Sequence, residues 1–373
     1  MVSLIGHGFK LNVIQIMTLT TYSRLVSSPQ HIEWKGMLLC LFLLWPLPAL
    51  SHEAGNLYRE ALAAIEIQDF KTAQSLLEQA IQEFPDFPEA HHLYGLVEFQ
   101  LAQQPERAIS ALQQAIRLNP NLAQAHYDLA LLFIKQDKME EAQKALQQAL
   151  TICPRFWEAR LTLAKLFDQL ALTIQAIQEY QTVLTQQPLQ AEALYNLASQ
   201  YMQTEDFDLA QPLLTQLTEH HPHHANGWYL LGRIAERQNQ PTEAISAYQQ
   251  VIQANPEHSE ARYNLGFLYQ QQGYEQKAIE HFQRVSQLKP QDAEAFFNLG
   301  VLLAGNQQLA EAEQAYQKGI ALQPNSLDGH FNLGAFYEFH KKDLLQARNH
   351  YQKYLDLGGK DPRIQQLLNQ LEQ

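Results

Sequence analysis

The chain has 373 residues, a length that would accommodate two or three globular domains, and a formal net charge of −13 at pH 7. This acidic balance argues against a nucleic-acid-binding protein, which needs a basic stripe on its surface. It is compatible with a soluble surface or with a cationic partner.

The first distinctive stretch of the chain is the almost wholly apolar segment 37–50. A transmembrane helix needs about 20 apolar residues, so this shorter run does not favour one. Lys35 precedes the segment, and Ala49 and Ser51 are the small residues expected just before a cleavage site. We therefore expect a cleaved secretory signal, with His52 at the mature start. An uncleaved anchor and cytoplasmic retention are the alternatives.

Further along the chain, residues 259–290 contain the clearest local pattern, which predicts two amphipathic helices. Leu265 lies on the apolar face of the first predicted helix and Phe282 on that of the second. Between them, Gly273 is expected to end the first helix, because glycine adopts the left-handed conformation without a steric penalty. Pro290 ends the second helix, because the residue before a proline avoids the α region.

This pattern is repeated along most of the chain. A proline closes each copy of the pattern. The first two prolines are 35 residues apart, and each later one follows its predecessor by 34 residues: Pro85, Pro120, Pro154, Pro188, Pro222, Pro256, Pro290 and Pro324. Each predicted first helix has a small residue at one position: Ala130, Ala164, Ala198, Gly232, Gly266, Gly300 and Gly334. Each second helix has a large one: Leu146, Tyr180, Leu214, Tyr248, Phe282 and Tyr316. Small and large residues at fixed offsets let neighbouring helices interlock.

These prolines and small residues resemble the tetratricopeptide repeat (TPR) family, whose helix–turn–helix unit has 34 residues. The resemblance covers residues 54–357, with nine repeats. It implies an all-α fold, a right-handed α-solenoid whose first helices line a concave groove. It also implies binding of peptides or protein segments, and no catalysis. The first repeat departs from the family pattern at Glu60, and the second and ninth each contain one extra residue.

We therefore divide the chain into an N-terminal extension with its signal peptide (1–51), a TPR array (52–357) and a C-terminal capping helix (358–373). Asp361 is the expected N-cap of the last helix, and Pro362 its first helical residue. The apolar stripe that would cover the last repeat is Ile364, Leu367, Leu368 and Leu371.

A row of asparagines occupies one repeated position of the predicted first helices. A primary amide offers two donors and an acceptor, which match a peptide group whatever the ligand's side chains. Neighbouring helices lie about 8–10 Å apart and an extended chain rises about 3.3 Å per residue, so the row could hold roughly every third residue. The alternative is an amide that bonds only locally. The row is Asn196, Asn264, Asn298 and Asn332, interrupted by Leu230.

An aromatic row precedes the asparagines, and aromatic residues are enriched in binding hot spots. The alternative for this row is packing between repeats. Its members are Tyr195, Tyr229, Tyr263, Phe297 and Phe331.

Acidic residues recur at the start of the first helices: Glu89, Glu158, Glu192, Glu260, Glu294 and Asp328. The family members that clamp a C-terminal carboxylate need lysine or arginine there, so a basic or neutral ligand is expected instead. The alternative is a solvated helix start, where acidic groups also favour the helix dipole.

Metal and catalytic sites are not predicted. His220, His221, His223 and His224 surround Pro222 in a tight turn that does not easily converge four imidazoles on one ion. The phosphate-binding, nucleophile-elbow and zinc-protease motifs are absent from the sequence, so no catalytic residue and no cofactor is expected.

The favoured function is a non-catalytic protein–protein interaction scaffold, periplasmic or secreted. It would hold an extended peptide or partner segment, with the asparagine row binding the backbone and the aromatic row burying apolar side chains. The expected partner is a protein or peptide and not a nucleic acid, and membrane contact is limited to the signal segment or a partner complex. The alternative is a polysaccharide-binding component of an exopolysaccharide or envelope export assembly. A purely structural assembly role is a third possibility.

Overall fold

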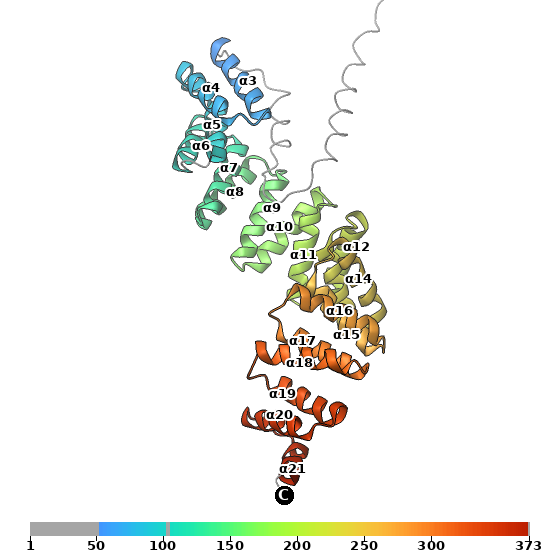
Figure 1. The fold of residues 1–373 in the computed structure, drawn as a ribbon. Coiled ribbons are helices and arrows are strands. Elements are labelled where there is room, and N and C mark those ends of the chain that lie inside the picture. Colours follow the sequence, from blue (N-terminus) through green and yellow to red (C-terminus); the bar gives the residue numbers. More distant parts are fainter. Residues whose placement is uncertain (1–51, 102–104, 372–373) are drawn as a thin grey trace, which may run out of the picture. The chain divides into compact units, whose positions relative to one another are not determined.

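A computed structural model describes residues 52–101 and 105–371 (Figure 1). The predicted signal segment lies outside these residues. The described part of the chain consists of helices and short connections, without a strand. It forms two compact units, which meet between Phe87 and Pro88 and are considered separately. In the described residues, every helix is too short or too polar to cross a membrane.

The first unit contains one helical pair, α3 (His52–Glu66) and α4 (Phe70–Glu83). Asp69 caps α4, because its carboxylate accepts a hydrogen bond of 3.1 Å from the backbone N–H of Thr72. The rings of Tyr58 and Phe87 pack 5.0 Å apart. This pair corresponds to the degenerate first repeat.

The second unit continues the same alternation of first (odd-numbered) and second (even-numbered) helices. They are α5 (Pro88–Leu101), α6 (Pro105–Leu118), α7 (Ala123–Lys135), α8 (Met139–Ile152), α9 (Trp157–Gln169), α10 (Thr173–Gln186), α11 (Ala191–Gln203), α12 (Phe207–His220), α13 (Ala225–Arg237), α14 (Pro241–Ala254), α15 (Ser259–Gln271), α16 (Glu275–Leu288), α17 (Ala293–Gly305), α18 (Leu309–Leu322), α19 (Leu327–Ala335), the π-helix η2 (Phe336–Lys341), α20 (Leu344–Asp356) and α21 (Pro362–Leu371). Consecutive helices pack against each other along the unit. The expected all-α solenoid of helix–turn–helix repeats is therefore confirmed.

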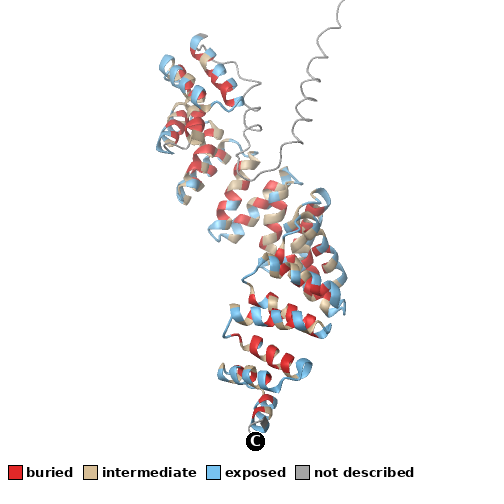
Figure 2. Cartoon of the chain, in the orientation of Figure 1, coloured by how far each residue is buried: buried red, intermediate tan, exposed pale blue. Residues whose placement is uncertain are grey.

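Small and large residues interlock inside the pairs. A Cβ atom on Gly266 would lie 2.7 Å from the ring of Phe282, and one on Gly232 would lie 2.6 Å from Tyr248. Both aromatic side chains are fully buried. The first and second helices of these repeats therefore approach at a distance that only glycine permits. Buried residues accordingly lie on the helix faces that meet a neighbour (Figure 2).

The turns inside the pairs share one backbone conformation. Gly273 has a φ of 76°, as its predicted role as a helix stop requires. The other described turns place a non-glycine residue in the same left-handed region: Gln68, Asp137, Ala171, Glu205, Asn239, Gln307 and Lys342.

The extra residue of the ninth repeat is absorbed by a π-helix. There α19 ends at Ala335 and the chain continues directly as the π-helix η2. A π-helix has more residues per turn than an α-helix, so it accommodates the extra residue without breaking the helical rod. In the second repeat, α5 has 14 residues where α7 of the third repeat has 13, and the segment 102–104 that follows α5 lies outside the described residues.

The capping helix covers the end of the array as expected. Ile364 and Leu368 of α21 are buried and join the same hydrophobic core as Tyr354 of α20. Arg363 adds an ion pair of 2.9 Å to Glu338 of η2.

Candidate functional site

The asparagine row lies on the first helices α11, α15, α17 and α19, and each of its members is half-buried. Asn264 Nδ2 donates a hydrogen bond of 2.9 Å to the hydroxyl of Tyr248. Asn298 Nδ2 donates one of 2.8 Å to the hydroxyl of Tyr263, which belongs to the preceding repeat. The amides therefore order tyrosine hydroxyls, while the carbonyl oxygens of Asn264 and Asn298 have no hydrogen-bond partner among the described residues.

The two ends of the row differ from each other. Asn196 is hydrogen-bonded to the hydroxyl of Tyr180, on the second helix of the preceding repeat. Among the described residues, the amide of Asn332 has no hydrogen-bond partner. The structure thus combines local bonding with unused donors and acceptors in the same row.

The aromatic row makes contacts between repeats. Tyr195 packs 5.3 Å from the ring of His224, and Tyr229 packs 5.0 Å from that of His258. Both histidines are N-caps of the next first helix. Within its repeat, Phe331 packs 5.5 Å from Tyr354. These side chains remain partly exposed, so one edge of each is accessible.

Tyr263 is held at both ends of its side chain. Its ring meets Phe282 edge-on at 5.4 Å, and its hydroxyl donates to Glu294 at 3.4 Å. Burial, with a smaller contribution from the carboxylate of Glu294, raises the pKa of Tyr263 to about 12. The hydroxyl therefore stays protonated at neutral pH and acts as a hydrogen-bonding group.

Phe297 differs from the other members of the row because it is buried. Cβ atoms on Gly319 and Gly329 would lie 2.5 and 2.4 Å from its ring, so the ring occupies the space that these glycines leave. Other second helices have Val251 and Val285 where α18 has Gly319. That departure from the repeat is the sequence signal that marks Phe297 as a packing residue.

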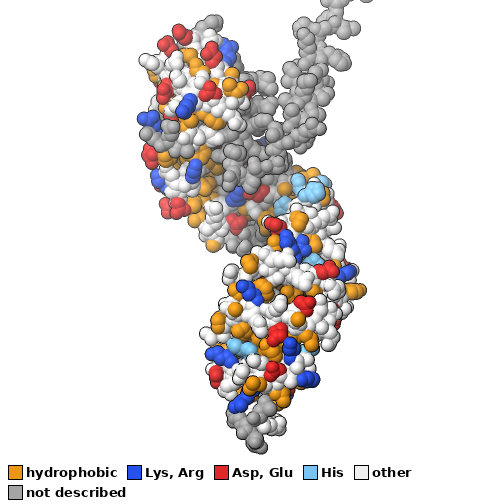
Figure 3. Space-filling model, viewed as in Figure 1, with side chains coloured by type: hydrophobic (Ala, Val, Ile, Leu, Met, Phe, Trp, Pro, Cys, Tyr) orange, Lys and Arg blue, Asp and Glu red, His pale blue; other side chains and the backbone are white. Residues whose placement is uncertain are grey.

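Two members of the acidic row are neutralised by lysines of the same unit. Glu260 pairs with Lys289 at 2.6 Å, and this hydrogen bond lowers the pKa of Glu260 to about 2. Glu192 pairs with Lys165 of the preceding repeat at 2.7 Å. On the face shown in Figure 3, acidic and basic side chains are interspersed, and neither sign forms a continuous field.

A cleft of about 340 Å³ lies beside the point where the asparagine row is interrupted. Its walls come from α11, from α13 and from the start of α12, and include Ser199, Met202, Gln203, Glu205, Phe207, Leu230, Arg233 and Arg237. The analysis of the sequence missed this site. The signals that could have indicated it are Leu230, which replaces the expected asparagine, and two arginines one turn apart on α13.

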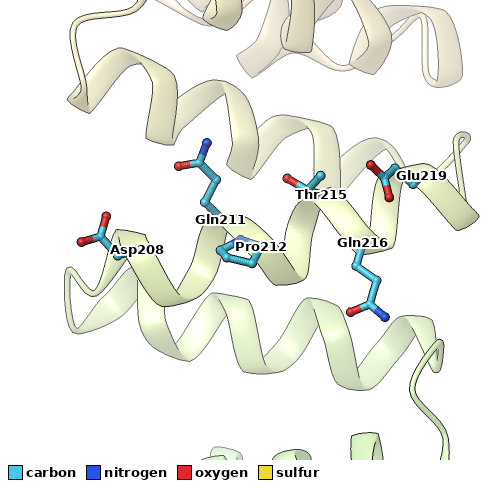
Figure 4. A pocket seen from close by; sticks show the side chains of 6 residues that line it. All are labelled: Asp208, Gln211, Pro212, Thr215, Gln216 and Glu219. Atoms are coloured by element: carbon cyan, nitrogen blue, oxygen red, sulfur yellow. The ribbon is translucent and has the colours of Figure 1, made fainter.

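A second hollow, of about 440 Å³, lies on the outer face of α12 (Figure 4). It is lined by Asp208, Gln211, Pro212, Thr215, Gln216 and Glu219. In Figure 4 these side chains lie along one side of the helix, and the two carboxylates stand at its opposite ends. They do not converge on one point, so we assign this hollow no chemistry.

The histidine-rich turn has structural partners. The ring of His224 accepts a hydrogen bond of 3.0 Å from the backbone N–H of Gly227, and the ring of His221 lies 3.2 Å from the carbonyl of Leu189. Burial lowers the pKa of His224, which favours the neutral ring that a cap requires. Within the described ranges, no three His, Cys, Asp or Glu side chains are grouped closely enough to hold a metal ion.

Three family models match the chain. They are described as the TPR domain of cytochrome c-type biogenesis protein H (residues 198–326), subunit 3 of the anaphase-promoting complex or cyclosome (residues 66–149) and the tetratricopeptide repeat (residues 297–362). No curated protein sequence matches.

Several solved structures are similar to the chain. A crystal structure of MamA is 23% identical and has a TM-score of 0.42, covering 45% of this chain and 91% of that one. A tetratricopeptide repeat protein from Parabacteroides merdae is 16% identical with a TM-score of 0.45, covering 67% and 99%. The Cut9–Hcn1 hetero-tetramer of the anaphase-promoting complex is 17% identical with a TM-score of 0.43, covering 78% and 57%.

Proposed function

Since the chain is a tetratricopeptide repeat protein, we propose that it is a non-catalytic scaffold that binds an extended segment of a partner protein on its first helices. The observation that carries this proposal is the asparagine row, whose half-buried amides keep hydrogen-bonding atoms that the fold does not use. A bound segment would satisfy these atoms with its own peptide groups.

The aromatic row supports this assignment in a second way. Tyr195, Tyr229 and Phe331 are fixed by their neighbours on one side and partly exposed on the other. Aromatic side chains that are already ordered lose little entropy when a ligand covers them, which favours binding. Phe297 would act only indirectly, by holding α18 and α19 together.

We propose no catalytic activity for the protein. In the described residues, Ser286 donates its hydroxyl to the carbonyl of Gln283, and Lys289 is paired with Glu260. These two side chains therefore stabilise the helices by hydrogen bonding and ion pairing, although their spacing resembles that of a catalytic nucleophile and base. For the cellular location, the proposal retains the periplasm, on the strength of segment 37–51 alone.

Binding of a polysaccharide is not proposed. A cationic sugar would need free carboxylates, and two members of the acidic row, Glu192 and Glu260, are already paired with lysines. A neutral sugar would need open aromatic faces, and the rings of Tyr195 and Tyr229 each have one side already packed against a histidine.

The test is crosslinking of the protein to its neighbours in intact cells, followed by quantification of the captured partner. The variant replaces Asn264, Asn298 and Asn332 together with alanine. Each lost hydrogen bond weakens binding by about 0.5–1.5 kcal/mol, so capture should fall at least about tenfold. Thermal denaturation of the purified variant checks that the fold survives.

A matched control removes three amides from the second helices instead. Gln276 and Gln283 of α16 and Gln314 of α18 are exposed, and their replacement with alanine should leave capture unchanged. Full capture by a folded asparagine variant would contradict the proposal and would move the interface away from the first helices.

A further inference from the structure

The cleft between α11 and α13 differs from the rest of the first-helix surface in its chemistry. Met202, Phe207 and Leu230 give it an apolar wall, and each of them is only partly buried. Leu230 stands where the neighbouring first helices carry an asparagine. Its volume of about 340 Å³ is at the lower end of the range typical of ligand pockets, ~300–1,000 Å³.

Arg233 and Arg237 form the charged rim of this cleft. They are four residues apart on α13 and therefore point from the same face of the helix. Neither has an ion-pair partner among the described residues. Two adjacent guanidinium groups repel each other, so a carboxylate placed between them would relieve that repulsion and accept hydrogen bonds from both.

The net charge of the chain is −13, so carboxylates outnumber the cations that could pair with them. Several other cations on the array are paired with a carboxylate: Arg160 with Glu179, Lys165 with Glu192, Lys289 with Glu260, Lys341 with Glu313 and Arg363 with Glu338.

The acidic groups nearest to the two arginines do not neutralise them. Glu205 lines the same cleft but forms no ion pair with either arginine. Glu236, which lies between them in the sequence, accepts a hydrogen bond from the hydroxyl of Tyr248. Neither arginine is therefore neutralised by an acidic side chain of the described residues.

We propose that this cleft binds a side-chain carboxylate of the partner segment together with a large apolar side chain beside it. The cleft would thus select an Asp or Glu next to a Leu, Ile, Met or Phe. This inference rests on the proposed function and adds the chemistry of the partner. It also replaces, for this one position, the expectation of a basic or neutral ligand.

The position of the cleft in the row indicates an internal acidic residue and not a chain end. Asn196 lies on one side of Leu230, and Asn264, Asn298 and Asn332 lie on the other. A segment whose backbone is held on both sides must pass across the cleft. Its terminal carboxylate would therefore lie elsewhere, and only a side chain could reach Arg233 and Arg237.

The experiment is selection from a phage-displayed library of random peptides on the purified full-length chain. Peptides of about 12 residues, at ~3.3 Å per residue, are long enough to cross the first helices of several repeats. The expected result is enrichment of an acidic residue adjacent to a large apolar one. Enriched peptides without an acidic preference would overturn the inference while leaving the proposed function intact, and an absence of any enrichment would overturn both.

The variant for this experiment copies the neighbouring repeat. Arg233→Ser with Arg237→Gln installs the residues that α11 carries at the same positions, Ser199 and Gln203, so the helix should fold normally. Affinity for the selected acidic peptides, measured by fluorescence anisotropy, should fall at least about tenfold, since hydrogen bonds between charged groups are lost. Affinity for the same peptides with Gln in place of the acidic residue should be equal in both proteins.

The matched control changes the net charge by the same amount elsewhere. Lys144→Gln with Lys318→Gln alters exposed cations of the second helices α8 and α18, and should leave the affinity unchanged. An equal loss in this control would show that the preference reflects overall charge, and would overturn the assignment to the cleft. A peptide that binds only with a free terminal carboxylate, and not as its amide, would overturn it as well.

Discussion

At the scale of single residues, the array depends on pairs of one small and one large side chain. Gly266 allows α15 to approach α16 until the ring of Phe282 fills the space where a Cβ atom would lie. The ring is fully buried and is also met edge-on by Tyr263 and Phe267. It therefore has little freedom to move aside.

Gly266→Ala should consequently destabilise the fold. The added Cβ would lie 2.7 Å from a ring atom of Phe282, a contact closer than real structures allow. Overpacking of a filled core typically costs about 1–3 kcal/mol. Chemical denaturation of the purified protein measures the change in the free energy of unfolding.

The matched control is Gly305→Ala, at the end of α17, where no atom lies within 4 Å of the new Cβ. There the better helix propensity of alanine should stabilise the protein by up to about 1 kcal/mol. Equal effects of the two substitutions would mean that the pairing of Gly266 with Phe282 does not control the approach of the helices.

The pairing of small with large residues could be predicted from the sequence, because it recurs at a fixed offset. The hydrogen bonds of the site could not. Asn298 bonds Tyr263 on the first helix of the preceding repeat, and Asn264 bonds Tyr248 on the second helix of its preceding repeat. The amide at one repeated position thus reaches tyrosines of either helix, and the spacing in the sequence does not say which.

At the scale of elements, the turns show how far a repeat imposes backbone conformation on its sequence. Gly273 occupies a left-handed position at no steric cost, but Ala171 adopts a φ of 55° at the same place in its repeat. A left-handed non-glycine residue costs roughly 1–2 kcal/mol. The packing of the paired helices must compensate for this cost.

Ala171→Gly should therefore stabilise the protein. The free energy gained by relieving the left-handed conformation should exceed the free-energy cost of the entropy that glycine adds to the unfolded chain. That cost is about 0.5–1 kcal/mol. We expect a net gain of up to about 1 kcal/mol and a higher midpoint of thermal unfolding. Ala171 is exposed, so no packing changes with it.

The reverse substitution, Gly273→Ala, should lower the free energy of unfolding by about 1 kcal/mol. No atom lies within 4 Å of the added Cβ, so the loss would arise from the backbone alone. A stability change of the same sign in both variants would show that these two turns do not share one conformation in solution.

The sequence predicts the ends of these helices to within a few residues, because the prolines and the helical period indicate where each helix stops. It also reveals one extra residue in the ninth repeat. It does not reveal that the residue is absorbed by η2, since an insertion could equally lengthen the turn. The outcome depends on tertiary contacts, such as the hydrogen bond from the hydroxyl of Tyr337 to Glu313 of the preceding repeat.

At the scale of the whole molecule, each repeat contacts chiefly its neighbours, so stability is a sum of local terms. The last repeat of such an array lacks a neighbour on one side. Here α21 supplies it, by burying Ile364 and Leu368 against the end of the array and pairing Arg363 with Glu338. Damage to the cap should accordingly loosen one end of the array and leave distant repeats intact.

The double variant Ile364→Ser with Leu368→Ser tests this expectation. Each buried side chain contributes roughly 1.5–3 kcal/mol, so the cap should detach. Amide hydrogen exchange in α19 and α20 should then accelerate by at least about tenfold, while α7 and α8 keep their protection, because local opening depends on nearby contacts. Gln366→Ser, on the exposed face of α21, is the control and should change neither region. Faster exchange along the entire array would instead show that the repeats unfold as one cooperative unit.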